Sequence, residues 1–398
     1  MRGLFAARAV RMFSYGLLSV VLVLHLVEVG LDERRIGILL TLTLVGDTAI
    51  SLGLTTAADR FGRRRTLLVG AALMVLASAV FASTGSFWWL LLSAIVGVVS
   101  PSGYEVGPFL PVEQAALTEE LEPERRTRVF ARYHVAGTLA TACGALAGGI
   151  LVQGLQAAGA SSGASYRAAV AAYGLGGLAL LALYARVSAA VEVAPAARAR
   201  TRPALHRSRG VVLRLSALFA LDSFAGGFVM QGILVWWFHV RFGVGEGALG
   251  VVFFATNVLG ALSALLAVRI AARIGLVNTM VFTHIPANLL LVLVPLMPSL
   301  PLAVLVWWLR ASISQMDVPT RQSYVLAVVD PDERSAAGGV TNVARSIGAA
   351  LAPALASPLL ADPAWHAVPF FVAGGLKIAY DLALWRAFRT LRPPEETA

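Results

Sequence analysis

Charged residues, cysteine and lysine are all scarce in this 398-residue chain, and each shortage excludes a class of protein. Charged residues make up 14% of the chain, whereas soluble domains carry about 25%. The one cysteine, Cys143, excludes an intramolecular disulfide and a cysteine-based metal cluster. The one lysine, Lys377, lies inside an apolar run, so the Gly-x-x-x-x-Gly-Lys loop of an ATPase is excluded as well. We therefore expect no enzyme activity, no cofactor and no bound metal.

Hydrophobic residues, by contrast, make up 58% of the chain and gather in unbroken runs long enough to cross a bilayer. Because lipid offers no partner to backbone N–H and C=O groups, such runs must cross as helices or as a closed barrel. The alternating segments typical of a membrane barrel are not seen. We therefore predict an all-α membrane protein. Its twelve predicted spans are residues 12–31, 36–57, 66–84, 87–110, 130–155, 166–187, 213–238, 247–268, 276–297, 302–328, 337–361 and 368–388.

Basic residues are distributed unevenly between the two ends of these spans. Arginine and lysine together number 32 against 22 acidic residues, a net charge of +10. With the N-terminus inside, 24 of the 32 fall on the inner side, Arg8 and Arg11 among them, and 4 on the outer side. This is the positive-inside pattern, so it predicts that both termini are cytoplasmic. The basic excess therefore indicates topology and not nucleic-acid binding. The partner we expect is the lipid bilayer, and we predict a monomeric multi-pass protein of a bacterial cytoplasmic (inner) membrane.

The two halves of the chain repeat each other. Pro111-Val-Glu113-Gln114 is matched 208 residues later by Pro319-Thr-Arg321-Gln322, and the turn at 122–127 is matched by the turn at 330–335. The longest polar stretch, 188–209, follows the sixth span and is rich in Ala, Arg and Pro. We predict an N-terminal six-helix bundle at 1–187, a cytoplasmic linker at 188–212 and a C-terminal six-helix bundle at 213–398, related by a parallel repeat.

A charged turn, Ala58-Asp59-Arg60-Phe61-Gly62-Arg63-Arg64-Arg65, separates the second and third spans. The pattern Asp-Arg-x-Gly-Arg-Arg at this place resembles the signature of the major facilitator superfamily, a family of secondary transporters. The six-plus-six repeat and the long central loop resemble that family as well, and together they cover nearly the whole chain. The resemblance implies two pseudo-symmetric six-helix bundles that rock about a midplane site. The subfamily is left open.

The resemblance also implies a latch at the cytoplasmic gate. Asp59 would face the N-terminal end of span eleven near Gly338, because helix N-termini attract anions. Arginines of the same turn would pair with acids of the facing half. Glu113 and Arg321 are equivalent in the two halves and opposite in charge, which suggests a salt bridge at this gate. The predicted gate residues are Asp59, Arg60, Gly62, Arg63, Arg64, Glu113 and Arg321. The alternative is that the turn's arginines are only topology anchors.

The second half carries a worn copy of this turn. Ala272-Arg273-Ile274-Gly275 follows the eighth span, with Ala272 at the place of Asp59. A further resemblance lies in span five, where Gly144-Ala145-Leu146-Ala147-Gly148-Gly149 is similar to the Gly-Pro-x-x-Gly-Gly stretch of proton-driven antiporters, with alanine in place of proline. That similarity favours efflux, although small residues also allow ordinary close packing of helices.

Ionisable residues inside the spans are the candidate coupling and substrate groups, because each costs roughly 2.5–3.5 kcal/mol to insert. Asp47 and Asp222 lie mid-span without an obvious local partner, and burial would let them exchange a proton near neutral pH. Static interhelical hydrogen bonds are the alternative. A lone Arg345 suits an anionic substrate. The full set of candidates is Asp47, Glu105, Asp222, Asp317, Arg345 and His25.

Two charge pairs at i,i+4 spacing are also predicted. Asp317 and Arg321 can pair with each other on span ten, or they can present opposite charges to the cavity across a helix break. Lys377 and Asp381 are expected to form a structural ion pair on span twelve, which the resemblance places at the periphery. His25, near the outer end of the first span, is expected to be solvated, whereas the family resemblance places spans one, four, seven and ten around the central cavity.

These observations predict a secondary active transporter that moves a small organic solute by alternating access. Proton-coupled efflux, an antiport, is the leading function. Uptake by symport, or facilitated transport of an organic anion, is the alternative. A membrane sensor that transports nothing is a second alternative, although a sensor has no need of charged residues within its spans.

Overall fold

The computed structural model describes residues 2–120, 123–186, 205–330 and 333–391. Within these ranges the side chains of residues 2, 56, 57, 59, 60, 118–120, 123–128 and 335 are outside the description. The chain divides into two compact units. Unit 1 comprises Met1–Arg200 and Met230–Asn257, and unit 2 comprises Thr201–Val229 and Val258–Ala398. The predicted boundaries at 187 and 212 follow the order of the spans and stay a prediction, because the linker lies largely outside the described residues.

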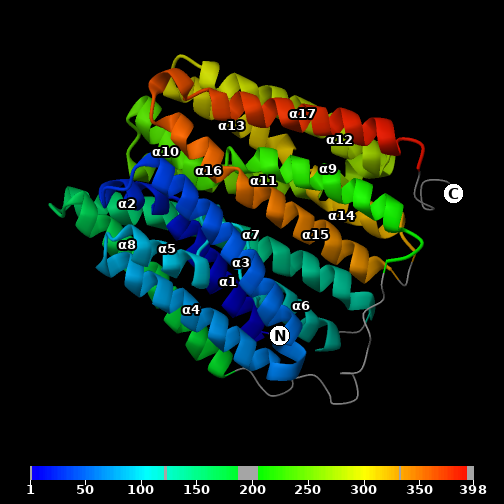
Figure 1. The fold of residues 1–398 in the computed structure, drawn as a ribbon, viewed down its shortest axis with the longest axis horizontal. Helices are drawn as coiled ribbons and strands as arrows, with labels where there is room; N and C mark the ends of the chain where they lie inside the picture. The colour runs from blue at the N-terminus through cyan, green and yellow to red at the C-terminus, as the bar shows by residue number, and fades with distance from the viewer. Residues whose placement is uncertain (1, 121–122, 187–204, 331–332, 392–398) are drawn as a thin grey trace. The chain divides into compact units, whose positions relative to one another are not determined.

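The described residues form long helices joined by short turns (Figure 1). Unit 1 contains α1 (Arg2–Ser19), α2 (Leu22–Glu28), α3 (Glu33–Phe61), α4 (Arg63–Ser83), α5 (Phe87–Val96), α6 (Phe109–Glu120), α7 (Pro123–Ala157), α8 (Ser162–Ala185), α10 (Gln231–Phe242) and the first part of α11 (Glu246–Ile274). Unit 2 contains α9 (Arg209–Gly227), the rest of α11, α12 (Leu276–Leu293), η3 (Val294–Leu296), α13 (Leu300–Ser314), α14 (Asp317–Ala327), α15 (Arg334–Leu351), α16 (Pro353–Ala356), η4 (Ser357–Leu360), η5 (Pro363–Trp365) and α17 (Val368–Phe388).

The all-α membrane fold predicted from the sequence is confirmed. In the described part of the chain, nine helices are long and apolar enough to cross a membrane, and the bent pair α1–α2 makes a tenth. The predicted spans 87–110 and 302–328 are each divided into two shorter helices, α5 with α6 and α13 with α14. Two of the twelve predicted spans are therefore not detected when each continuous helix is tested for length and hydropathy.

Interruptions occur in the first, fourth, seventh and tenth predicted spans. The axis bends by 42° between α1 and α2, and residues 228–230 separate α9 from α10. Residues 97–108 separate α5 from α6, and Gln315 and Met316 separate α13 from α14. The break at 97–108 is the longest because it contains Gly97, Pro101, Gly103, Gly107 and Pro108, which all disfavour a continuous helix.

Side chains from neighbouring helices satisfy the unwound backbone at 97–108. The hydroxyl of Tyr15 donates to the Val106 carbonyl at 3.1 Å, and the hydroxyl of Tyr173 donates to the Val98 carbonyl. The Gly107 N–H donates to Asp47 at 2.6 Å. Such partners are required because irregular backbone is tolerated at membrane depth only where protein or a water-filled cavity satisfies it. Tyrosines and an aspartate on intact helices thus hold a non-helical segment in place.

Close helix contacts in both units depend on glycine. On α7, a Cβ added to Gly144 would overlap the carbonyl oxygen of Phe13 on α1. On α15, a Cβ added to Gly348 would overlap the carbonyl oxygen of Ala220 on α9. These are equivalent helix pairs, spans one and five in the first half and spans seven and eleven in the second. The contact of Gly144 supports the close-packing interpretation of the glycine stretch in span five.

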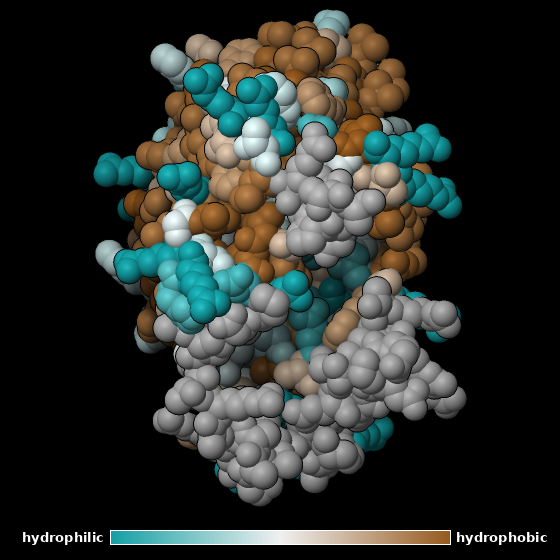
Figure 2. All heavy atoms as spheres, turned by 90° about the vertical axis from the view of Figure 1, so that its right-hand side faces the viewer, coloured by the Kyte–Doolittle hydropathy of each residue, from teal (hydrophilic) through white to brown (hydrophobic). Residues whose placement is uncertain are grey.

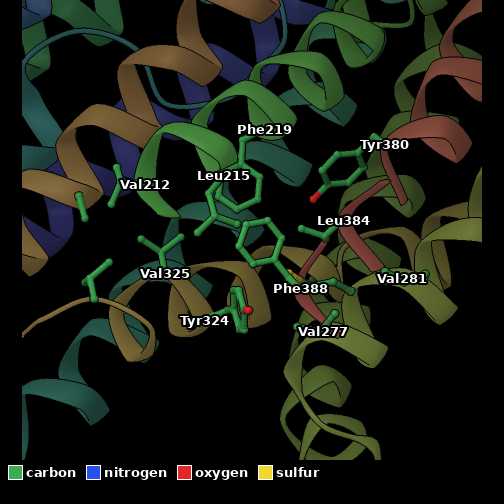
Figure 3. Packing of buried hydrophobic residues seen from close by; sticks show 13 residues of the cluster. Val212, Leu215, Phe219, Val277, Val281, Tyr324, Val325, Tyr380, Leu384 and Phe388 are labelled. Carbon is green, nitrogen blue, oxygen red and sulfur yellow. The ribbon is translucent and has the colours of Figure 1, made fainter. Parts of the chain in front are cut away.

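Unit 2 contains an apolar cluster that joins its helices (Figure 3). Phe219 of α9, Tyr324 of α14 and Phe388 of α17 are among its buried aromatic residues. Val277 of α12 belongs to the same cluster and is 7% exposed. Seen from the end where α9 begins and α17 ends, hydrophilic side chains project from a largely hydrophobic surface (Figure 2). Val212 near the start of α9 and Phe388 at the end of α17 belong to the cluster, which therefore lies close to this end of the two helices.

A glutamate caps the segment that leads into α9. The carboxylate of Glu333 accepts the backbone N–H groups of His206 at 2.5 Å, Arg207 at 2.9 Å and Ser208 at 2.8 Å. Hydrogen bonds from Ser208 and from the N–H groups of His206 and Arg207 lower the pKa of Glu333 from 4.5 to about 2. The free N–H groups at a helix start attract an anion, which is the physical reason for this contact.

Replacing Gly144 or Gly348 by valine should destabilise the protein, because the new side chain must separate two helices that now touch. Overpacking of this kind costs about 1–3 kcal/mol. Thermal unfolding of the purified protein in detergent would measure the effect. The matched control is Gly154→Val on the same helix as Gly144, since a Cβ at Gly154 has no atom within 4 Å. An equal loss of stability in the Gly154 variant would contradict the interpretation.

The capping glutamate should make stability depend on acid pH. A carboxylate with a lowered pKa contributes stability that is complete above about 4.5 and is lost as the pH falls toward about 2. Melting curves recorded between these values should fall more steeply for the wild type than for Glu333→Gln. The variant should also melt at lower temperature at neutral pH. Identical pH profiles for the two proteins would show that the cap contributes nothing.

Candidate functional site

A buried cluster of charges lies in unit 1, here called the N-cluster: Arg8, Arg11, Glu105, Glu113, Tyr133 and Tyr184. The guanidinium of Arg11 contacts both carboxylate oxygens of Glu113, at 2.8 and 2.7 Å. Its Nε donates to Glu105 at 2.7 Å, and Arg8 donates to the other Glu105 oxygen at 2.8 Å. Two cations thus face two carboxylates, and the set is electrically balanced.

Two tyrosines complete the partners of Glu113. Tyr184 donates to its Oε1 at 2.7 Å, and Tyr133 donates to its Oε2 at 2.5 Å. Arg11 and Glu113 are both 0% exposed. The sequence pattern predicts that Arg8 and Arg11 are topology residues of the inner side. Their contacts with Glu105 and Glu113 show that they are instead partners of carboxylates in the N-cluster. Their place near the start of the first span concealed this role, because sequence alone does not distinguish an anchoring arginine from one that points inward.

Two other predicted residues, Asp47 and His25, also lie in unit 1. Asp47 on α3 accepts from the Gly107 N–H and, at 3.3 Å, from the Ser51 hydroxyl. It therefore has local partners, contrary to expectation. His25 is 0% exposed, and its Nε2 lies 2.9 Å from the Phe81 carbonyl. The expectation that His25 is solvated is wrong, because α2 packs inside its unit.

Unit 2 contains a second buried cluster, the C-cluster: Asp222, His284, Asn288, Asp317, Arg321, Lys377 and Asp381. Asp222 on α9 is its centre. Its Oδ1 lies 2.5 Å from the ammonium of Lys377, and its Oδ2 lies 3.3 Å from the guanidinium of Arg321. Arg321 also contacts Asp317 at 2.8 Å, which confirms the pair predicted at i,i+4. Asp222 therefore joins α9 to α14 and α17 and, contrary to expectation, has two charged partners.

Asp381, the aspartate of α17, has different partners. Asp381 is contacted by His284 Nδ1 at 2.9 Å and by the Asn288 amide at 3.0 Å, both from α12. The predicted ion pair between Lys377 and Asp381 is wrong, because each side chain turns toward a different neighbouring helix. His284 Nε2 also lies 4.0 Å from Asp222. The imidazole is thus flanked by two carboxylates. The three residues are far apart in the sequence, so sequence spacing does not predict this arrangement.

Arg345 on α15 lies within electrostatic range of this second cluster. Asp222, Asp317 and Arg321 are among the groups that act on its charge. Its Nε is buried and has no hydrogen-bond partner. The predicted role of Arg345 at an anionic substrate is untested, but its position close to the C-cluster is compatible with that role.

The charged turn between α3 and α4 is described in part. Gly62 has φ of 102°, a conformation that favours glycine, and its N–H donates to the Ala58 carbonyl at 2.9 Å. Arg63 is 6% exposed. Arg64 donates to the carbonyls of Tyr184 and Ala185 at the end of α8, at 3.2 and 2.5 Å. The side chains of Asp59 and Arg60 lie outside the described residues, so the latch stays a prediction.

Glu113 and Arg321 each have partners within their own unit. Glu113 binds Arg11 of the first span, and Arg321 binds Asp222 of the seventh. The two equivalent positions thus pair with the equivalent span of their own half, with the charges reversed. A salt bridge between Glu113 and Arg321 stays a prediction. Among the described residues, no group of three or more His, Cys, Asp or Glu side chains is placed to hold a metal.

Comparison with known proteins agrees with this architecture. A family model described as Major Facilitator Superfamily matches residues 4–353 and also residues 241–398. An uncharacterized membrane protein of Saccharomyces cerevisiae is 30% identical over 413 residues, which cover 96% of this chain and 92% of that protein. Its yeast source gives no support to the bacterial membrane predicted from the sequence.

Solved structures share the fold at low identity. The nucleoside transporter NupG has 12% identity and a TM-score of 0.74, with 98% of each chain covered. The xylose transporter XylE from E. coli, in an inward open conformation, has 13% identity and a TM-score of 0.73, with 97% of this chain and 95% of that chain covered. The matched family, the helical fold and the repeated halves lead to one conclusion: the chain belongs to the major facilitator superfamily and is a membrane transporter, not an enzyme.

Proposed function

We propose that this secondary transporter couples the movement of a small organic solute to protons through the C-cluster. The observation that carries the proposal is the imidazole of His284, which lies 2.9 Å from Asp381 and 4.0 Å from Asp222. Imidazole is the side chain that ordinarily gains and loses a proton near neutral pH. An imidazole between two carboxylates can accept a proton and keep it within hydrogen-bond reach of both.

The charges in contact within this cluster support the proposal. Three carboxylates, Asp222, Asp317 and Asp381, face two permanent cations, Arg321 and Lys377. One proton on the imidazole would balance the set. Because an unbalanced charge is costly in a buried site, uptake of that proton and the arrangement of the surrounding helices are linked.

Protonation of this cluster can change how the helices that hold these groups pack against one another. Asp222 lies on α9 and Arg321 on α14, the inner halves of two interrupted spans. Interrupted helices near a midplane site are typical of secondary transporters. A proton that weakens the attraction of Asp222 for Lys377 or Arg321 would alter how α9 packs on α14 and α17. Such a proton would shift the equilibrium between two states only if they differ in proton affinity.

For direction, we propose export with proton antiport. The resemblance of the Gly144–Gly149 stretch to proton-driven antiporters supports it, although Gly144 also has a packing role. The fold is shared with a D-xylose-proton symporter at 14% identity and a TM-score of 0.71, which is compatible with protons as the coupling ion and leaves direction open. From the distribution of arginine we also propose cytoplasmic termini, and we propose a monomeric transporter.

Transport of an organic anion is the second candidate. The observation that favours it is Arg345, whose buried Nε has no hydrogen-bond partner beside a cluster whose other charges are in contact. An anionic group could bind this guanidinium without displacing an existing ion pair. In this case the anionic group of the substrate would pair with Arg345, and movement of the solute would not require a proton.

Replacing His284 by glutamine should uncouple solute movement from proton movement, because glutamine retains a hydrogen-bond donor but does not titrate. Proteoliposomes with a luminal pH dye would be exposed to nucleosides, sugars, peptides and organic acids in turn. We expect a solute-driven proton flux for the wild type, and a flux lower by about tenfold or more for the variant. The sign of the pH change distinguishes antiport from symport.

The matched control for that experiment is His366→Gln. The imidazole of His366 is also buried in unit 2, but its Nε2 lies 3.0 Å from the Leu360 carbonyl and not between carboxylates. This variant should keep the wild-type flux. Full coupling in the His284 variant would overturn the assignment of the proton site. Solute flux without any proton movement in the wild type would favour the facilitator instead.

A double-mutant cycle should distinguish the observed partner of Glu113, which is Arg11, from the predicted partner, which is Arg321. Neutralising Glu113 and Arg11 together should destabilise the protein by less than the sum of the single changes, because either alone leaves a buried charge unpaired. Coupling between contacting residues is about 0.5–3 kcal/mol. Glu113→Gln with Arg321→Gln should be additive in thermal unfolding. Strong coupling of Glu113 to Arg321, in stability or in transport, would instead support the predicted gate salt bridge.

A further inference from the structure

The worn copy of the charged turn has the same backbone as the original. Gly275 has φ of 85° and Gly62 has φ of 102°, and each is the residue before the next helix, α12 or α4. The N–H of Gly275 donates to the Ala271 carbonyl at 2.9 Å, as Gly62 does to Ala58. The two halves thus keep the turn and differ in the side chains that surround it.

Four of the five charged side chains of the first copy are replaced in the second. Ala272 stands at the place of Asp59. Arg64, whose guanidinium binds the last carbonyls of α8, is replaced by Val277. Val277 is part of the apolar cluster with Phe388, close to the end of α17 (Figure 3). The end of α17 therefore has no arginine at the place where Arg64 binds the end of α8.

A cavity of about 770 Å³ lies at this place in unit 2. The worn turn forms one wall, and parts of α14 and α17 form the others. Arg273 from the turn and Arg389 from the end of α17 both line it, together with the polar side chains of Asn278 and Ser323. Its described lining contains no aspartate or glutamate. The cavity therefore has an excess of positive charge and room for an anionic group.

The rim of the cavity continues into an exposed apolar surface of α11. Val268 lines the cavity and is 69% exposed, and Ile274 lines it and is 42% exposed. Leu265, one turn before Val268, is 57% exposed. Exposed apolar side chains on a membrane helix face acyl chains. The turn itself belongs to the end of the spans that the arginine distribution places in the cytoplasm.

We propose that this cavity binds an anionic phospholipid of the inner leaflet. Its phosphate would lie between Arg273 and Arg389, and an acyl chain would follow Val268 and Leu265 along α11. Guanidinium groups bind phosphate with strong, directional hydrogen bonds. Basic pockets between membrane helices on the cytoplasmic side are suited to such headgroups. The site is separate from the C-cluster and does not depend on proton coupling.

Phosphatidylglycerol and phosphatidylcholine with identical acyl chains are the probes, added to the full-length protein in detergent. Because a bound ligand stabilises the folded state, phosphatidylglycerol should raise the melting temperature by about 3 °C more than phosphatidylcholine. Arg273→Gln with Arg389→Gln should abolish this difference. Ala272→Asp should at least halve it, because the restored carboxylate would compete for Arg273. Both variants should melt like the wild type in phosphatidylcholine, which shows that they fold.

The matched control is Arg269→Gln with Arg386→Gln. These exposed arginines lie on α11 and α17 near the same end but do not line the cavity. This variant should retain the full response to phosphatidylglycerol. An equal loss in the control would show general surface attraction and overturn the proposal. So would an equal response of the wild type to phosphatidylcholine. A shift of the same size with sodium phosphate alone would identify a free-anion site and overturn the assignment to lipid.

Discussion

The bidentate contact between Arg11 and Glu113 places two opposite charges in an interior that offers them no water. Neither residue is tolerable there without the other, because removal of one partner leaves a buried charge. Tyr133 and Tyr184 occupy the remaining positions on the carboxylate. The same constraint explains the unwound segment 97–108, whose backbone is bound by Tyr15, Tyr173 and Asp47. Satisfying polar groups away from water therefore explains both the charge clusters and the contacts that hold the break at 97–108.

The two halves meet this constraint in the same way but with reversed charge. In unit 1 a cation on the first span binds an acid on the fourth, Arg11 with Glu113. In unit 2 an acid on the seventh span binds a cation on the tenth, Asp222 with Arg321. The two halves differ more in the side chains of the charged turn. The turn at Gly275 keeps its backbone but has lost the aspartate and three of the four arginines, and a cavity lies beside it.

The sequence alone predicted the membrane fold, the turn at Gly62 and the pairing of Asp317 with Arg321, because all three depend on local pattern or on helical spacing. It did not predict that Lys377 contacts Asp222 and not Asp381, since Lys377 and Asp222 lie 155 positions apart. His284 was not singled out for the same reason. Arg11 was counted as a topology residue because position in a span does not reveal the direction of a side chain.

Composition and periodicity by themselves determined that this chain lies in a membrane as helices, and the charged turn with its repeat determined the family. These conclusions need only short-range pattern, because lipid allows few backbone structures and the family motif is local. Tertiary structure alone decided which charges meet and that the worn turn borders a cavity. Each of those outcomes depends on side chains brought together from distant helices, a relation that sequence spacing does not encode.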